Sequence, residues 1–188
     1  MRKSAAAEIV ARRLAVARGR TDSLVQRASE ADLLPTSEGS RRYPPDLGAI
    51  ELTNLFLAVV TDRGLANASQ SVREFAALEN EHGKRFGDAL TDMFSHGPAL
   101  ASAVTGNLVL RLEPPSVSMT LGGTHVRYGP EPPTDSAGKH VIVPGRTLAA
   151  IGLEFSGHSP HNANTIVALA SASRSLDLSA AFSSPGSA

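Results

Sequence analysis

The chain has 188 residues, of which 41% are hydrophobic, 19% are charged and none is cysteine. This composition can bury a core, and it excludes disulfides and thiolate metal sites. No apolar run approaches the roughly 18 residues that a bilayer span requires. We therefore expect a cytoplasmic protein with no membrane partner.

The charge is unevenly distributed although it sums to zero. Residues 1–45 carry nine Lys/Arg and five Asp/Glu, a net charge of +4, whereas residues 46–100 carry four and eight, a net charge of −4. The remaining residues carry five of each. A basic terminal segment is typical of a module that binds a polyanion such as DNA. An arginine-rich, solvated helix face would explain the same charge.

Two short helices are predicted near the N-terminus. Apolar residues at spacings of three and four predict a helix over 4–17, which Gly19 ends. A second helix is expected from Thr21, as its N-cap, to Leu34, where Pro35 stops it.

A β-hairpin is predicted directly after the second helix, over 36–43. Gly39 supplies the turn and Tyr43 is a strand-forming residue. The order helix, turn, helix and hairpin is that of a winged helix-turn-helix, in which the second helix enters the major groove and the hairpin contacts phosphates.

Further along, three helical patterns are followed by strand patterns. Helices are expected over 47–61, from about Ala68 and from about Arg85, the first being apolar on more than one face and hence a central core helix or a dimer surface. Period-two patterning then predicts strands over 108–112, 117–121, 124–128 and 140–143, with a slight preference for a helix over 146–155.

The sequence thus predicts an α+β protein. We expect a winged helix-turn-helix domain over 1–62, a helical extension over 63–105, a separate β-rich module over 106–170 and a flexible, serine-rich tail over 171–188. The β-rich module is not strongly basic, so we expect it to mediate self-association or partner contacts rather than DNA binding.

The candidate DNA-binding residues fall into two groups. Gln26 and Arg27 suit base edges, because glutamine pairs bidentately with adenine and arginine with guanine. Phosphate contacts are expected from the arginines that flank the second helix, and Ser23 lies on the exposed side of that helix. The full set is Arg18, Arg20, Ser23, Gln26, Arg27, Arg41 and Arg42.

A family resemblance is carried by the segment Leu33-Leu34-Pro35, Gly39, Arg41-Arg42-Tyr43 and Asp46-Leu47. It resembles the part of MerR-type regulators in which the recognition helix runs into the wing and a third helix. The resemblance implies wing contacts to phosphate by Arg41 and Arg42, with Tyr43 packed beneath the wing. The chain departs from that family by lacking an aromatic-rich second helix and a long C-terminal dimerisation helix.

No catalytic motif stands out, so we expect neither an enzyme nor a cofactor. His158 and His161 have a permitted spacing for metal ligands but no nearby acid, and His82, His96, His125 and His140 are scattered. We therefore expect no metal site.

The leading functional hypothesis is a DNA-binding transcription regulator that acts as a homo-oligomer, with a dimer most plausible. One alternative is a phage-type DNA-packaging or assembly subunit, for which a ring of many subunits would be expected. Another is a protein-interaction adaptor that docks on the transcription machinery. The sequence does not specify the target DNA, activation versus repression, or an effector.

Overall fold

The computed structural model describes residues 1–36, 45–131 and 137–182. In these residues the protein is an α+β fold with eight α-helices, one short 3₁₀ helix and a four-stranded sheet. The helices are α1 (Lys3–Arg13), α2 (Arg18–Glu30), α3 (Ala49–Val60), η1 (Leu65–Asn67), α4 (Ala68–Ala76), α5 (Phe86–Ser95), α6 (Gly97–Ala103), α7 (Gly145–Phe155) and α8 (Pro160–Phe182). The strands are β1 (Asn107–Arg111), β2 (Ser116–Leu121), β3 (Thr124–Tyr128) and β4 (His140–Pro144).

The sheet is antiparallel throughout, with strand order β3-β2-β1-β4. The expected hairpin is formed by β2 and β3, with Leu121 opposite Thr124, and β4 returns to pair with β1. Alternate residues point to opposite faces, so Leu108, Leu110 and Met119 are buried on the inner face.

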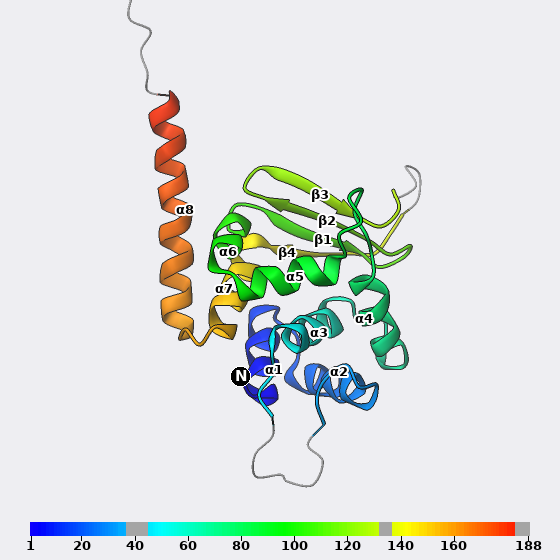
Figure 1. The fold of residues 1–188 in the computed structure, drawn as a ribbon. Coiled ribbons are helices and arrows are strands. Elements are labelled where there is room, and N and C mark those ends of the chain that lie inside the picture. Colours follow the sequence, from blue (N-terminus) through cyan, green and yellow to red (C-terminus); the bar gives the residue numbers. More distant parts are fainter. Residues whose placement is uncertain (37–44, 132–136, 183–188) are drawn as a thin grey trace, which may run out of the picture.

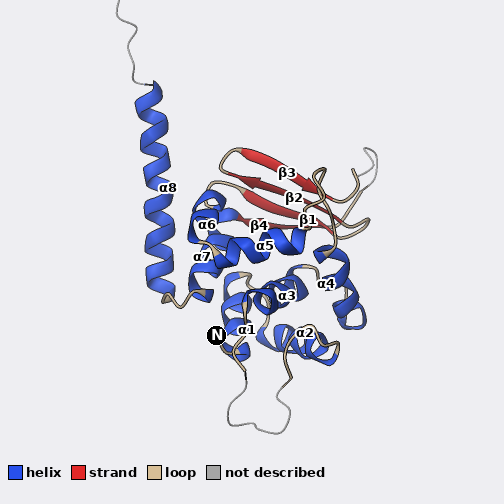
Figure 2. Ribbon diagram, in the orientation of Figure 1, coloured by secondary structure: helices blue, strands red, loops and turns tan. Residues whose placement is uncertain are grey.

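The elements form layers (Figures 1 and 2). Helices α5, α6 and α7 lie against one face of the sheet, and α1, α2, α3 and α4 lie on the far side of these helices. The other face of the sheet is not covered by any described helix. The two sides of the molecule therefore expose different surfaces, one helical and one formed by strands.

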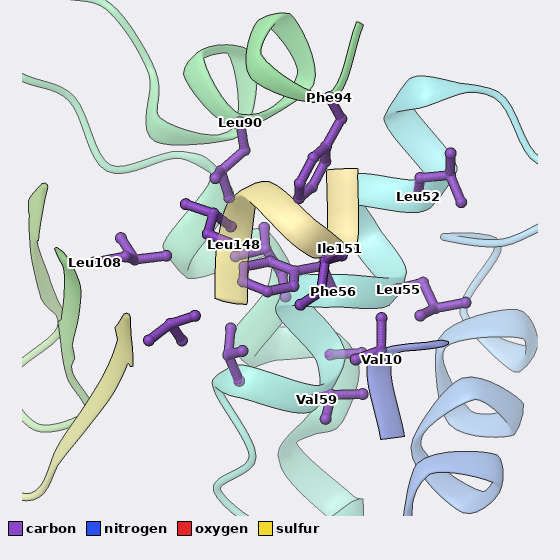
Figure 3. Packing of buried hydrophobic residues seen from close by; sticks show 14 of the residues in the cluster. Val10, Leu52, Leu55, Phe56, Val59, Leu90, Phe94, Leu108, Leu148 and Ile151 are labelled. Atoms are coloured by element: carbon purple, nitrogen blue, oxygen red, sulfur yellow. The ribbon is translucent and has the colours of Figure 1, made fainter. Parts of the chain in front are cut away.

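Helix α3 lies at the centre of the core, as one of the two sequence-based alternatives predicted. Every residue from Leu55 to Val60 is buried, which explains why the helix is apolar on more than one face. The Phe94 ring packs edge-on against Phe56 of α3 and Phe155 of α7, with ring centroids 5.6 and 5.2 Å apart. Figure 3 shows Phe56 and Phe94 near Ile151 and Leu148.

The core extends without a break from the N-terminal helices to the sheet. Val10 of α1, Leu55 of α3, Leu108 of β1 and Ile151 of α7 belong to one cluster of buried side chains. The expected boundary between residues 105 and 106 therefore does not separate two hydrophobic cores.

The first interhelical turn lies earlier than the sequence analysis expected. Helix α1 ends at Arg13, and the chain reverses through Ala15, whose φ is +53°. Gly19 lies in the first turn of α2 rather than ending the preceding helix, and the N-cap is Ala17 rather than Thr21. Thr21 is instead fully buried. The local glycine signal was misleading because Ala15 adopts the left-handed conformation itself.

The structure has a helix over 171–182, where the sequence analysis expected a flexible tail, and residues 183–188 of that expected tail lie outside the described residues. Residues 171–182 continue α8, a helix of 23 residues, so the chain does have a long C-terminal helix. Ala163 and Val167 of this helix are buried, and α8 packs along α7 before extending past the body of the protein (Figure 1). The many serines obscured this helix, whose buried apolar residues among the described side chains are Ala163 and Val167.

Candidate nucleic-acid interface

Helix α2 presents one packed face and one solvent face. Thr21, Leu24, Val25 and Ala28 are buried, and the helix contacts α1, α3 and α4. Since α2 is supported from three sides, its outward side chains are displayed on a rigid element rather than on a loop.

The solvent face of α2 contains the two residues expected to contact bases. Gln26 and Arg27 are both exposed, and both donate hydrogen bonds to the Glu30 carboxylate over 2.9 Å. Ser23 is half-buried, and its hydroxyl donates to the carbonyl of Gly19 in its own helix. Glu30 therefore holds Gln26 and Arg27 together at the C-terminal end of α2.

The two arginines at the start of α2 differ in their surroundings. Arg18 is exposed and pairs with Asp22, one turn along the same helix, over 2.9 Å. Arg20 forms two hydrogen bonds, of 2.7 and 2.6 Å, to the carboxylate of Asp62, which follows α3. The hydrogen bond from Arg20 holds the pKa of Asp62 below its ordinary value, against the opposing effect of burial. Arg20 thus ties α2 to the end of α3.

Two further arginines of the basic segment are directed into the protein. Arg12 and Arg13, at the end of α1, both pair with Glu154 of α7, whose side chain is only 2% exposed. Sequence analysis gave Glu154 no role, and the only signal available was an acid within the apolar pattern of residues 146–155. These contacts fix α1 to α7.

Internal pairing reduces the charge available to a polyanion. Of the seven Lys and Arg residues between Met1 and Thr36, five form ion pairs with carboxylates of described residues. Two of these carboxylates, Asp62 and Glu154, lie outside the first 45 residues, so the +4 of that segment overstates its surface charge.

The expected wing lies outside the described residues, since Arg41, Arg42 and Tyr43 fall within 37–44. The chain on both sides of this segment is anchored to α1. Lys3 donates to the carbonyl of Pro35 over 3.0 Å, and the backbone N–H of Leu47 donates to the carbonyl of Met1 over 2.7 Å. The described residues Pro35 and Leu47, on either side of 37–44, thus lie beside the start of α1.

The part of the chain that the structure describes contains neither a candidate metal site nor a candidate membrane span. No group of three or more metal-ligating side chains occurs there. His158 and His161 are exposed at the connection between α7 and α8. No described helix combines the length and apolar character needed to cross a bilayer.

Comparison with known proteins provides no relative from which a function can be transferred. No known family matches the sequence, and neither a curated protein nor a solved structure is significantly similar to the chain.

Proposed function

We propose that the protein binds double-stranded DNA through a winged helix-turn-helix in which α1 and α2 are the two helices, and that it acts as a transcription regulator. The observation that carries the proposal is the solvent face of α2, where exposed Gln26 and Arg27 project from a helix held by α1, α3 and α4. A supported helix with a polar outer face can enter a major groove about 12 Å wide.

The ion pair on this face can be exchanged for DNA. Arg27 and Glu30 are 55% and 48% exposed, and exposed pairs contribute only about 0–1 kcal/mol. A bidentate contact from arginine to guanine contributes about 1–3 kcal/mol to discrimination between bases. Binding would therefore displace Glu30 and transfer Arg27 to a base edge.

Fewer residues are proposed to contact phosphate than the sequence suggested. Arg18 is exposed and its partner Asp22 is exposed, so it can reach a phosphate. Arg20 has a structural partner in Asp62 and is left out of the proposed surface. Arg41 and Arg42 remain the proposed wing contacts on the basis of sequence.

The test is fluorescence anisotropy with DNA fragments selected from a genomic pool, at about 50 mM salt and above. We expect Arg27→Ala to relax discrimination at one base position by about 1–3 kcal/mol. Glu30→Gln should tighten binding, because a neutral amide accepts a weaker hydrogen bond from Arg27 than the carboxylate does and no longer repels DNA. Arg41→Ala with Arg42→Ala should weaken binding to all sequences alike and flatten the salt dependence.

A matched control for these variants lies on the opposite side of the protein. Arg127 of β3 is 44% exposed and pairs with Glu131 over 2.9 Å, much as Arg27 pairs with Glu30. Arg127→Ala should leave DNA binding unchanged. Absence of binding at about 50 mM salt, or equal effects of the Arg27 and Arg127 variants, would contradict the proposal.

A DNA-packaging or assembly subunit is the second candidate, and α8 is the observation that favours it. Ile166 and Leu169 of α8 are 38% and 64% exposed, and the helix extends past the body of the protein (Figure 1). Exposed apolar residues on a projecting helix suit contact with another copy of the chain. Mass measurement by light scattering separates the candidates, because a dimer favours a regulator and a ring of many subunits favours assembly.

A further inference from the structure

A hollow of about 520 Å³ lies among α3, α4 and α5, beside Leu33, which follows α2. Cavities of about 300–1,000 Å³ suit small organic ligands, which they hold with mostly apolar walls and a few polar groups. The apolar part of the lining is formed by Leu33, Ile50, Val72, Ala76 and Ala77. Ile50 is 64% exposed although it is a large apolar side chain, so a ligand in the hollow would cover apolar surface that water now contacts.

The three helices around the hollow are fixed to one another. Helix α5 approaches α4 closely at Gly87, where a Cβ would lie 3.0 Å from the Cβ of Ala76. The hydroxyl of Thr91 on α5 donates to the Gly87 carbonyl over 2.8 Å, and its Oγ1 lies 3.1 Å from Oγ1 of Thr53 on α3. The hollow is therefore a feature of packed helices rather than of a loop.

Two uncharged polar side chains in the lining keep a hydrogen-bond acceptor. The single hydroxyl hydrogen of Thr91 is used on the Gly87 carbonyl, so Thr53 donates to Thr91 and its own oxygen can accept. Asn54 donates from Nδ2 to the Leu33 carbonyl over 3.0 Å, which leaves its Oδ1 as an acceptor. The hollow can thus receive hydrogen bonds from N–H groups of a ligand.

The charged part of the lining contains two bases and two acids, which are Arg73, Arg85, Asp88 and Asp92. Arg85 and Asp92 already have partners of opposite charge, since Arg85 pairs with Glu79 over 3.5 Å and Asp92 pairs with Lys84 over 2.6 Å. The lining is therefore neutral as a whole, and Arg73 and Asp88 are the two charges to consider for a ligand.

Arg73 and Asp88 are both exposed and lie on different helices, α4 and α5. Arg73 donates from Nη2 to the Ala31 carbonyl over 2.9 Å, but it pairs with no carboxylate of the described residues. This bond uses one of the five N–H groups of the guanidinium. Asp88 forms neither a hydrogen bond nor an ion pair with the residues that the structure describes. A ligand carboxylate can thus bind Arg73, and a ligand ammonium group can bind Asp88.

We propose that this hollow binds a small zwitterion with an apolar body, the chemistry of an apolar α-amino acid. Asp88 holds the ammonium group, Arg73 holds the carboxylate, and the apolar body packs on Ile50 and Val72. A neutral lining with both signs of charge favours a ligand with both charges, because a ligand with one charge would satisfy one side and be repelled by the other. The proposal does not rest on DNA binding, since none of these four residues belongs to α2 or to the expected wing.

The test titrates the full chain with three molecules that share one apolar chain and differ in charge. L-Leucine carries both charged groups, 3-methylbutylamine lacks the carboxylate, and 4-methylpentanoate lacks the ammonium group. Calorimetry measures the affinities, and the side-chain NMR signals of Ile50 and Asn54 report whether the ligand lies in the hollow. We expect saturable binding of L-leucine, and each analogue should bind at least about tenfold more weakly because it loses a charge-assisted hydrogen bond.

Two variants assign each charged group of the ligand to its partner. In Asp88→Asn the preference for L-leucine over 4-methylpentanoate should disappear, whereas in Arg73→Gln the preference over 3-methylbutylamine should disappear. A general loss of stability would weaken all three ligands together and would leave both preferences in place. Both replaced side chains are exposed, so circular dichroism should show an unchanged fold.

Arg127→Gln and Glu8→Gln are the matched controls, because neither residue lines the hollow, and both should keep the wild-type affinities. L-Methionine and L-phenylalanine extend the test to other apolar bodies. The proposal is overturned if none of the three amino acids binds saturably up to about 10 mM. Equal affinity for L-leucine and one of its analogues would show a site for a single charge and would also overturn it. So would preferences that stay unchanged in both Asp88→Asn and Arg73→Gln.

Discussion

Arg13 of α1 donates a hydrogen bond from Nε to Oε1 of Glu154 on α7 over 2.6 Å, although 141 positions separate them in the sequence. Arg12 binds the other carboxylate oxygen of the same residue. One buried acid thereby joins the N-terminal helices to the helix that underlies the sheet.

Replacing Glu154 with alanine should therefore destabilise the protein by about 3 kcal/mol, since the largely buried Arg13 loses the carboxylate that balances its charge. Urea unfolding followed by circular dichroism measures the change. Glu8→Gln is the control, because the exposed pair of Glu8 with Arg18 is 3.9 Å long and its loss should cost less than about 1 kcal/mol. Equal losses in the two variants would contradict the structural role of Glu154.

The Arg20–Asp62 pair predicts a stability loss in acid. The hydrogen bond from Arg20 lowers the pKa of Asp62 in the folded state, so the unfolded chain binds the proton more readily. The contribution is complete above the ordinary carboxyl pKa and is lost as the pH falls from about 4 through the lowered value.

Urea unfolding of the wild type and of Asp62→Asn across pH 2.5–7 tests this expectation. The wild type should be more stable at pH 7, by no more than about 1 kcal/mol because both side chains are partly exposed, and the difference should shrink in acid. A difference that grew as the pH fell would show the opposite sign of linkage.

Two glycines should respond in opposite directions to alanine. Gly19 lies within α2 with open space around its Cα, so Gly19→Ala should stabilise the protein by about 0.5–1 kcal/mol. A Cβ on Gly145 would lie 1.8 Å from the carbonyl oxygen of Ala103, so Gly145→Ala should destabilise by about 1–3 kcal/mol or more. Thermal unfolding measures the stability of both variants. If Gly19→Ala destabilised the protein, Gly19 would instead have the helix-ending role that the sequence suggested.

The shared core predicts that residues 1–105 do not fold alone. Such a chain lacks Leu108, Leu110 and Ile151, which belong to the same buried cluster as Val10 and Leu55. We expect strong binding of a hydrophobic dye and no cooperative urea transition. A chain ending at Ser173, which keeps every buried side chain of the described residues, should unfold cooperatively. A cooperative transition in the 1–105 chain would instead establish two independent domains.

Local patterns were sufficient for much of the secondary structure. Helical spacing predicted α3, α4 and α5, and period-two alternation predicted the β2–β3 hairpin, because each pattern reflects which side of an element is buried. The preference for a helix over 146–155 is likewise confirmed by α7. The patterns failed at Gly19 and beyond Ser171, where individual residue types were given more weight than the contacts made by the whole helix.

The sequence by itself determined the α+β class, the order of most elements and the polar solvent side of α2, since these depend on residues close together in the chain. Only the tertiary structure decided which charged side chains are paired within the protein and which remain available to a DNA ligand. It paired Arg12 and Arg13 with Glu154 and paired Arg20 with Asp62. The physical reason is that an electrostatic interaction depends on distance in space and on burial, and neither is encoded in the spacing of residues along the chain.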